Sequence, residues 1–355
     1  MTSSARFAAN LLRHGALACA REAVTIMQRE APALLADGLP ETFADPVEDT
    51  RVRALVLAEA LDVDRAPLFA HQIEWYRVAL AHRGVDDDYL PANLRALRTA
   101  LAQALPAACG PDVDRHLRLA EATARAAPRE QPSWLAGAAP LRDEARRFLL
   151  AVLENRRQHA IELVLRAHAA GATIVDLHEH VLMLAMREIG RMWLMAEIPI
   201  ADEHFASRVV ETCLERLAEL QPTVAPSGHK VLLFAVGGNQ HGLAVRFAAE
   251  RLAGRGHEIL DLGADLPAAD LEWSLQDRPV DLIVCGAALV LQLGSLRATI
   301  ESLRRGLGAA CPPLLAGGAP FAVVPDLHTV LGADAGAGDV ASAVCRADEL
   351  LARRR

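Results

Sequence analysis

The sequence of 355 residues predicts a multidomain α and α/β protein. We expect an all-helical N-terminal domain, a four-helix bundle, and a flavodoxin- or Rossmann-like domain with a five-stranded parallel sheet. Three observations predict this order: a first stretch with helical apolar spacing, four further helical segments with short turns, and then short apolar runs alternating with helices. We place these domains at residues 1–128, 142–221 and 229–355.

Composition argues against several classes of protein. The net charge of −8 disfavours a large nucleic-acid-binding face, because phosphate binding needs a local excess of Lys and Arg. None of the six cysteines forms a Cys-x-x-Cys pair, which argues against zinc-finger and thioredoxin-like sites. No signal peptide opens the chain, and no run of about 18 apolar residues suggests a membrane span. We therefore expect a cytoplasmic protein with no membrane or direct nucleic-acid partner.

The N-terminal domain is predicted from segments with apolar residues three or four positions apart. Pro67 near the start and Gly84 at the end delimit one of these helices. Residues 129–141 carry two prolines and little periodicity, so they are the expected linker. The predicted helices cover residues 5–30, 66–84, 90–106 and 112–128.

The second helical set is predicted to be a bundle, because antiparallel helices with short loops bury their apolar stripes best in that way. Gly171 and Pro199 interrupt the pattern, and residues 221–229 form a second linker. The predicted helices cover residues 143–155, 157–171, 174–195 and 200–220.

From residue 230 onward, short apolar runs alternate with helical stretches, which is typical of a parallel sheet covered on both faces. The predicted strands cover 230–236, 257–263, 280–286, 312–318 and 333–338, and the helices 242–254, 267–276, 291–307, 320–331 and 339–353. Such a sheet binds ligands at the carboxyl ends of its strands.

His241 lies at such a place, in the stretch GGNQHGLAVRF between the first strand and its helix. A solvated loop histidine or a helix cap is the simple alternative. A phosphate loop is not favoured, because the stretch matches neither GxGxxG nor GK[ST]. A catalytic triad is not favoured either, because no serine occupies the turn.

In order and spacing, residues 229–355 resemble a cobalamin-binding domain. That family carries Asp-x-His-x-x-Gly in the first turn, Ser-x-Leu after the third strand and Gly-Gly after the fourth. The resemblance implies that His241 coordinates cobalt from below, displacing the cofactor's own base, and that the nucleotide tail enters a slot along the sheet. The implied cofactor-binding positions are Asn239, Gln240, His241, Gly242, Gly286, Ala288, Leu289, Gly317 and Gly318, with Ala244 at the last signature position.

The residue types suit this chemistry. A neutral imidazole is a good cobalt ligand, and residues without bulk can line a narrow channel. Tight strand–helix packing is the alternative role of the glycines. Two departures matter: Asn239 can accept the ring proton of His241 but has no charge to strengthen the ligand, and Gly286 replaces a serine that would bond the buried tail.

Residues 142–221 resemble the four-helix cap that often precedes such a sheet. Trp193, followed after nine residues by Glu203 and His204, resembles the pattern of CarH-type photoreceptors, which hold adenosylcobalamin in the dark. The resemblance implies that Trp193 lies over the upper axial group and that Glu203 and His204 contact the adenosyl moiety. The alternative is that Trp193 packs in the core of the bundle and that Glu203 and His204 belong to the first turn of a helix. Leu194 stands where that family has histidine, so its bis-histidine light state does not carry over.

The N-terminal domain differs from the winged helix of CarH-type repressors, because it is longer, all-helical and not basic. Its place before the cap and the sheet is similar to the layout of photocobilins, which pair cobalamin with a bilin such as biliverdin. His71, Trp75 and His82 share one helix face, with Tyr76 and Arg77 beside it. Such a face can grip a tetrapyrrole. A helix packed at a domain or dimer interface is the alternative.

The leading hypothesis is a non-enzymatic light-sensing signalling protein. Photolysis of the cobalt–carbon bond of adenosylcobalamin would change its conformation or assembly, with biliverdin as a candidate second chromophore. The expected partner is a second copy in a homodimer or a regulatory protein. One alternative is a corrinoid methyl carrier of a methyltransferase system, a family that usually keeps Asp at position 239 and lacks the Trp-x9-Glu-His pattern. A ligand-free regulatory scaffold is the other.

Overall fold

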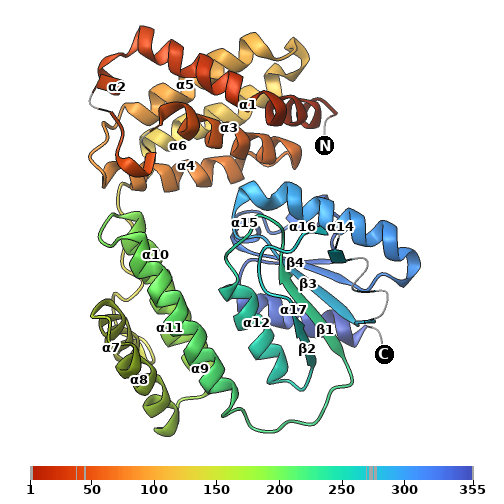
Figure 1. Cartoon of the computed structure of the whole chain (residues 1–355). Helices are drawn as coiled ribbons and strands as arrows, with labels where there is room; N and C mark the ends of the chain where they lie inside the picture. Colours follow the sequence, from red (N-terminus) through yellow and green to blue (C-terminus); the bar gives the residue numbers. More distant parts are fainter. Residues whose placement is uncertain are drawn as a thin grey trace.

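The computed structural model describes residues 3–36, 38–43, 45–268, 270–271, 275 and 278–353. The predicted fold class is confirmed: two helical regions precede a five-stranded parallel α/β domain. In Figure 1 the N-terminal helices lie at the top, the bundle at the lower left and the α/β domain at the lower right. Among the described residues, no helix is long and apolar enough to cross a bilayer.

The N-terminal region contains one long helix that the sequence prediction missed. Helix α3 begins at Pro46, and Asp45 caps it with a side chain that accepts a hydrogen bond from the Val47 amide. Its buried residues include charged ones such as Arg53 and Glu59, so its apolar periodicity is weak. The elements are α1 (Ser3–Glu30), α2 (Ala33–Ala36), η1 (Glu41–Phe43), α3 (Pro46–Asp62), α4 (Ala66–Ala81), α5 (Tyr89–Ala104), η2 (Ala107–Cys109) and α6 (Gly110–Ala126).

A fully buried arginine lies at the centre of this domain. Arg53 donates to Asp49 at 3.0 Å and to Asn93 at 2.9 Å, and its guanidinium lies 4.8 Å from the centre of the Tyr76 ring. Burial alone would lower the pKa of Arg53, but the Asp49 carboxylate together with Tyr89 and Tyr76 outweighs burial and raises it. Such a pair adds little net stability, yet losing one partner would leave a buried charge uncompensated.

The bundle differs from the prediction in its third helix. Residues 174–195 form a helical segment with one π-helical turn, and this turn contains the buried His178. Its imidazole meets the Phe247 ring edge-on, with 5.5 Å between the ring centres. The elements are α7 (Arg142–Leu153), α8 (Arg157–Ala169), α9 (Ile174–Leu177), η3 (His178–Leu182), α10 (Met183–Leu194) and α11 (Ile200–Ala218).

The α/β domain has one parallel sheet in the order β2-β1-β3-β4-β5. The predicted helix 267–276 lies partly outside the described residues, and the predicted helix 320–331 is two short helices separated around Pro325. The strands are β1 (Lys230–Ala235), β2 (Glu258–Asp261), β3 (Leu282–Gly286), β4 (Leu314–Gly317) and β5 (Ala335–Ala337). The helical elements are α12 (Leu243–Ala253), η4 (Val290–Gln292), α14 (Leu293–Leu307), η5 (Gly308–Ala310), α15 (Ala319–Val323), α16 (Leu327–Leu331) and α17 (Val340–Ala352).

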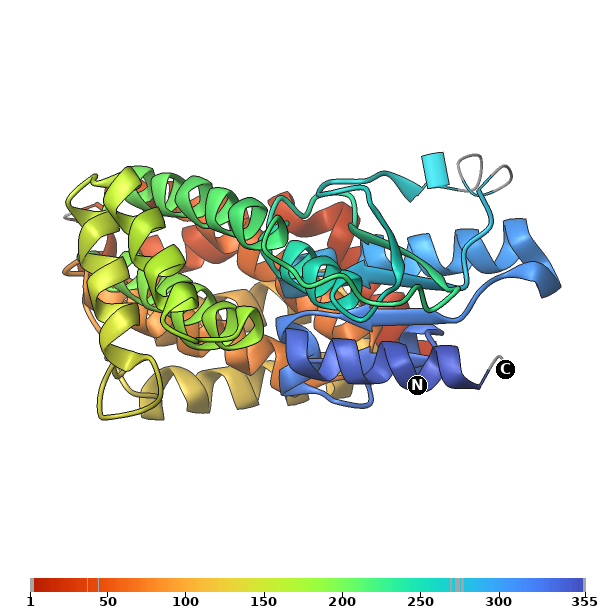
Figure 2. The ribbon, with the colours of Figure 1, turned by 90° about the horizontal axis from the view of Figure 1, so that it is seen from below.

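Each face of the sheet shares a hydrophobic core with a different helical region. Because side chains alternate along a strand, Leu232 and Phe234 of β1 join the core that contains the N-terminal helices. Val231 and Leu233 join the core that contains the bundle. Seen from below, the N-terminal helices extend behind both other regions (Figure 2).

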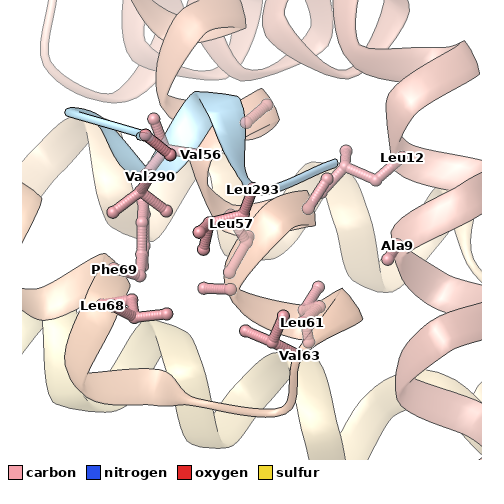
Figure 3. Packing of buried hydrophobic residues seen from close by; sticks show 14 of the residues in the cluster. Ala9, Leu12, Val56, Leu57, Leu61, Val63, Leu68, Phe69, Val290 and Leu293 are labelled. Carbon is pink, nitrogen blue, oxygen red and sulfur yellow. The ribbon is translucent and has the colours of Figure 1, made fainter. Parts of the chain in front are cut away.

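The N-terminal domain packs on the segment that follows β3. Val290 and Leu293 lie among Val56, Leu57 and side chains of α4 (Figure 3). Beside this apolar contact, the Asp62 carboxylate is 3.1 Å from the Arg297 guanidinium of α14. The N-terminal helices are therefore held against the loop at the carboxyl end of β3, which is the edge where a ligand would bind.

His178 should make the protein sensitive to acid. Burial, and secondarily the charge of Arg251, lower its pKa from 6.5 to about 4. Between these values the unfolded chain is protonated at this residue and the folded chain is not, so stability falls as the pH falls from 6.5 to about 4. The full loss is about 3 kcal/mol. Urea unfolding across this range should show a smaller pH dependence for His178→Leu than for wild type. The exposed His14→Leu is the control, and equal slopes for all three proteins would contradict the assignment.

Candidate functional site

The turn after β1 is organised by a buried asparagine. Asn239 is 1% exposed, and its side-chain amide donates to the Gly286 carbonyl of β3 at 3.1 Å. Its amide oxygen accepts from the backbone N–H of His241 at 3.0 Å. The sequence predicted that this oxygen would accept a hydrogen bond from the imidazole ring of His241, whereas in the structure it accepts one from the backbone of that residue. Asn239 thus fixes the path of the turn.

Neighbouring loops hold the same turn from both sides. The Asp265 amide donates to the Asn239 carbonyl at 3.0 Å, and the Asp265 carboxylate accepts from the Gly238 amide at 2.6 Å. From the loop after β3, Gln292 donates to the Gly238 carbonyl at 3.2 Å. The exposed His241 is therefore presented by a rigid backbone.

His241 borders a cavity of about 300 Å³ at the carboxyl ends of the strands, between α12 and α17. This volume is at the lower end of the range for small-molecule sites. Its wall is mostly apolar or glycine. The lining residues are Met183, Arg187, Asn239, His241, Ala244, Val245, Ala248, Val284, Cys285, Gly286, Ala287, Ala288, Gly317, Gly318, Ala319, Ala337, Gly338, Asp339, Val340 and Ala343.

The predicted glycines line this cavity for two physical reasons. A Cβ on Gly286 would lie 3.0 Å from Cγ2 of Val245, and one on Gly317 would lie 3.3 Å from the Ala337 carbonyl oxygen. Side chains at these positions would narrow the space between the sheet and its helices. Gly318 has φ +129°, and a Cβ there would collide with the Ala287 carbonyl oxygen, so its backbone itself requires glycine.

Other predicted site residues lie outside the cavity wall. Gln240 and Leu289 are exposed, and Gly242 is the N-cap residue of α12, beside Ala264. Glu203 accepts a hydrogen bond from Ser207, and His204 is 76% exposed. The structure therefore brings His241, Asn239, Gly286, Ala288, Gly317 and Gly318 together at the cavity.

Trp193 packs against the N-terminal domain. Its ring lies 5.8 Å from that of Trp75 on α4, at an interplanar angle of 31°. Arg83 follows α4, and its guanidinium lies 5.4 Å from the Trp193 ring centre. The same guanidinium donates to the carbonyls of Trp193 at 2.9 Å and Leu194 at 2.7 Å. This contact joins the end of α10 to the N-terminal helices.

The candidates for a second chromophore do not form one open face. Tyr76 is buried beside Arg53, and burial raises its pKa to about 12. Trp75 is engaged by Trp193, while His82 lies 3.1 Å from the Arg129 carbonyl oxygen. His71 is exposed beside Glu74. The observed packing matches the alternative of a helix at a domain interface.

Sequence reasoning missed several residues of the cavity wall, among them Met183, Arg187 and Asp339. Met183 and Arg187 come from α10 of the bundle, and Asp339 caps α17. The N-cap of α17 had a sequence signal in its Asp-x-x-Ser pattern, but the approach of α10 depends on how the bundle docks on the sheet.

Comparison with known proteins supports a corrinoid cofactor. Residues 144–218 match the family model of the B12 binding domain. Dimethylamine corrinoid protein 3 of Methanosarcina acetivorans is 24% identical over 202 residues, covering 57% of this chain and 93% of that protein. Dimethylamine corrinoid protein 1 of the same organism is 25% identical over 179 residues, covering 50% and 83%. The monomethylamine corrinoid protein structure from Methanosarcina barkeri shares the fold, with a TM-score of 0.53 and 21% identity over 59% of this chain and 99% of that chain.

Replacing Asn239 by aspartate should loosen the turn. A carboxylate cannot donate to the Gly286 carbonyl and would bring a buried charge beside it, so we expect Asn239→Asp to lose about 1–3 kcal/mol in the free energy of unfolding. Urea denaturation would measure the loss. The same chemical change at the exposed neighbour, Gln240→Glu, is the control. Equal stability of the two variants would contradict the role of Asn239.

Arg83 should stabilise the end of α10. Arg83→Ala removes two hydrogen bonds to terminal helix carbonyls, so amide hydrogen exchange in residues 193–198 should accelerate by about tenfold. Arg95→Ala, at an exposed position on α5, is the matched control. Unchanged exchange in Arg83→Ala would show that this contact does not hold the helix end.

Proposed function

We propose that this chain is a corrinoid carrier that binds cobalamin through His241 and presents the cobalt to a partner methyltransferase. The observation that carries the proposal is the position of His241 at the border of a mostly apolar cavity whose wall is kept thin by Gly286 and Gly317. The B12 binding domain match in the bundle and the named corrinoid-protein relatives support it.

The residues present fit a corrinoid. The cavity is too small for a whole corrinoid but has a suitable size for the base of its nucleotide tail. A neutral imidazole is a suitable cobalt ligand, and His241 is exposed on a turn that Asn239 fixes. When bound, a corrinoid supplies a cobalt centre that can accept and donate a methyl group.

The protein's own part in this function is to bind and to orient. His241 would hold the cofactor from the α/β domain, and the wall that includes Gly286, Gly317 and Val245 would shield the tail from water. Met183 and Arg187 bring α10 of the bundle to the same site. In this proposal the chain is a carrier and the catalytic groups belong to the methyltransferase.

The light sensor is the second candidate, because Trp193 connects the bundle to the N-terminal domain. Loss of an upper ligand near that contact would change how the two regions pack. The carrier is favoured because Trp193 packs on Trp75, because His204 is largely exposed, and because the named relatives are corrinoid proteins. The packing of Tyr76 gives biliverdin binding no support.

Spectroscopic titration with cobalamin tests the proposal. Wild type should bind cobalamin, and His241→Ala should bind at least about 10–100-fold more weakly, because even the loss of a residue that supports a metal ligand has an effect of that size. His14→Ala, an exposed histidine on α1, should bind like wild type. Failure of wild type to bind, or equal binding by His241→Ala, would contradict the proposal.

Green light and one further variant separate the two candidate functions. A carrier loaded with adenosylcobalamin should keep its oligomeric state after illumination, as measured by light scattering during gel filtration. His204→Ala should then bind adenosylcobalamin as wild type does. A light-dependent change of assembly, together with weaker adenosylcobalamin binding by His204→Ala, would favour the sensor.

A further inference from the structure

The cavity beside His241 is bordered by a positively charged side chain, Arg187, on the side of the bundle. Apart from His241, its charged lining residues are Arg187 of α10 and Asp339 before α17, and most of the others are apolar or glycine. A ligand that joins a flat apolar group to an anion matches this distribution of charge.

The Arg187 guanidinium is available to a ligand. It lies over the Trp134 ring, 5.6 Å from the ring centre, and within the described part of the chain it donates no hydrogen bond to a protein acceptor. Arg191, one turn later on α10, differs because it is ion-paired with Glu188 and Glu197 at 2.8 Å each. The N–H groups of Arg191 are thus bound to carboxylates within the bundle, whereas the guanidinium of Arg187 borders the cavity.

Asp339 does not neutralise Arg187 through a direct ion pair. Its carboxylate accepts from the Ser342 amide at 2.7 Å and from the Ser342 hydroxyl at 2.8 Å, which caps α17. Burial would raise the pKa of Asp339, but these hydrogen bonds and the charge of Arg187 lower it. The carboxylate is thus committed to the helix cap.

We propose that Arg187 binds the phosphodiester in the nucleotide tail of the corrinoid, an inference that rests on the proposed function. An arginine fork matches two phosphate oxygens, and Trp134 supports its plane. The base of the tail would then occupy the apolar cavity while the phosphodiester lies against α10. Arg187 therefore selects corrinoids that carry a complete tail, and binding of the tail connects the bundle to the α/β domain.

Binding of two corrinoids distinguishes a contact between Arg187 and the nucleotide tail from a general structural role of Arg187. Cobalamin has the nucleotide tail, and cobinamide lacks both its base and its phosphodiester. Arg187→Gln should weaken cobalamin binding by about tenfold, as expected for a hydrogen bond to a charged group, and should leave cobinamide binding unchanged. Arg187→Lys keeps the charge without the fork, so its cobalamin affinity should fall between those of wild type and Arg187→Gln. Arg208→Gln on α11, an exposed arginine outside the cavity wall, is the control.

The outcomes separate this inference from the function on which it rests. If wild type binds cobalamin and Arg187→Gln binds it equally well, the inference is wrong and the carrier proposal survives. Equal weakening for both corrinoids would assign Arg187 a structural role and also overturn the inference. If wild type binds neither corrinoid, the proposed function itself fails.

Discussion

The two hydrogen bonds of the Asn239 side chain are the constraint on which the proposed site depends. One bond ties the turn after β1 to the carbonyl at the end of β3, and the other sets the backbone at His241. Aspartate, which the cobalamin-binding signature has at this position, could not donate to that carbonyl. The amide at 239 therefore supplies a donor to the backbone carbonyl of Gly286, which also accepts from the Val236 amide at 3.0 Å.

The two faces of the sheet place the other two regions on either side of this turn. Alternate side chains of β1 enter two cores, one shared with the N-terminal helices and one with the bundle. The loops after β3 and β4 carry Val290 and Gly318, so the N-terminal contact and the cavity lie at the same sheet edge. Helix α10 borders the cavity through Arg187 and contacts the N-terminal domain through Trp193. A ligand in the cavity would therefore contact the α/β domain and the bundle directly and the N-terminal domain through α10.

Features that depend on residues close together in the sequence could be predicted, whereas features that depend on how the domains pack could not. The strands and the turn with His241 follow from local patterns, and the glycines of the wall follow from the resemblance to a cobalamin-binding domain. Helix α3 was missed because its buried face contains charged groups such as Arg53, which apolar periodicity does not register. Arg187 and the packing of Trp193 could not be predicted, because both follow from how domains dock rather than from spacing along the chain.

The most direct test of the central claim identifies the atom that binds cobalt. Electron paramagnetic resonance of reduced, cobalt(II) cobalamin bound to the protein resolves splitting by the axial nitrogen. With histidine labelled by ¹⁵N, the account predicts that the triplet from ¹⁴N becomes a doublet, and that His241→Ala abolishes this labelled signal. A triplet that persists in the labelled protein would mean that the cofactor keeps its own base, and would contradict the assignment of His241.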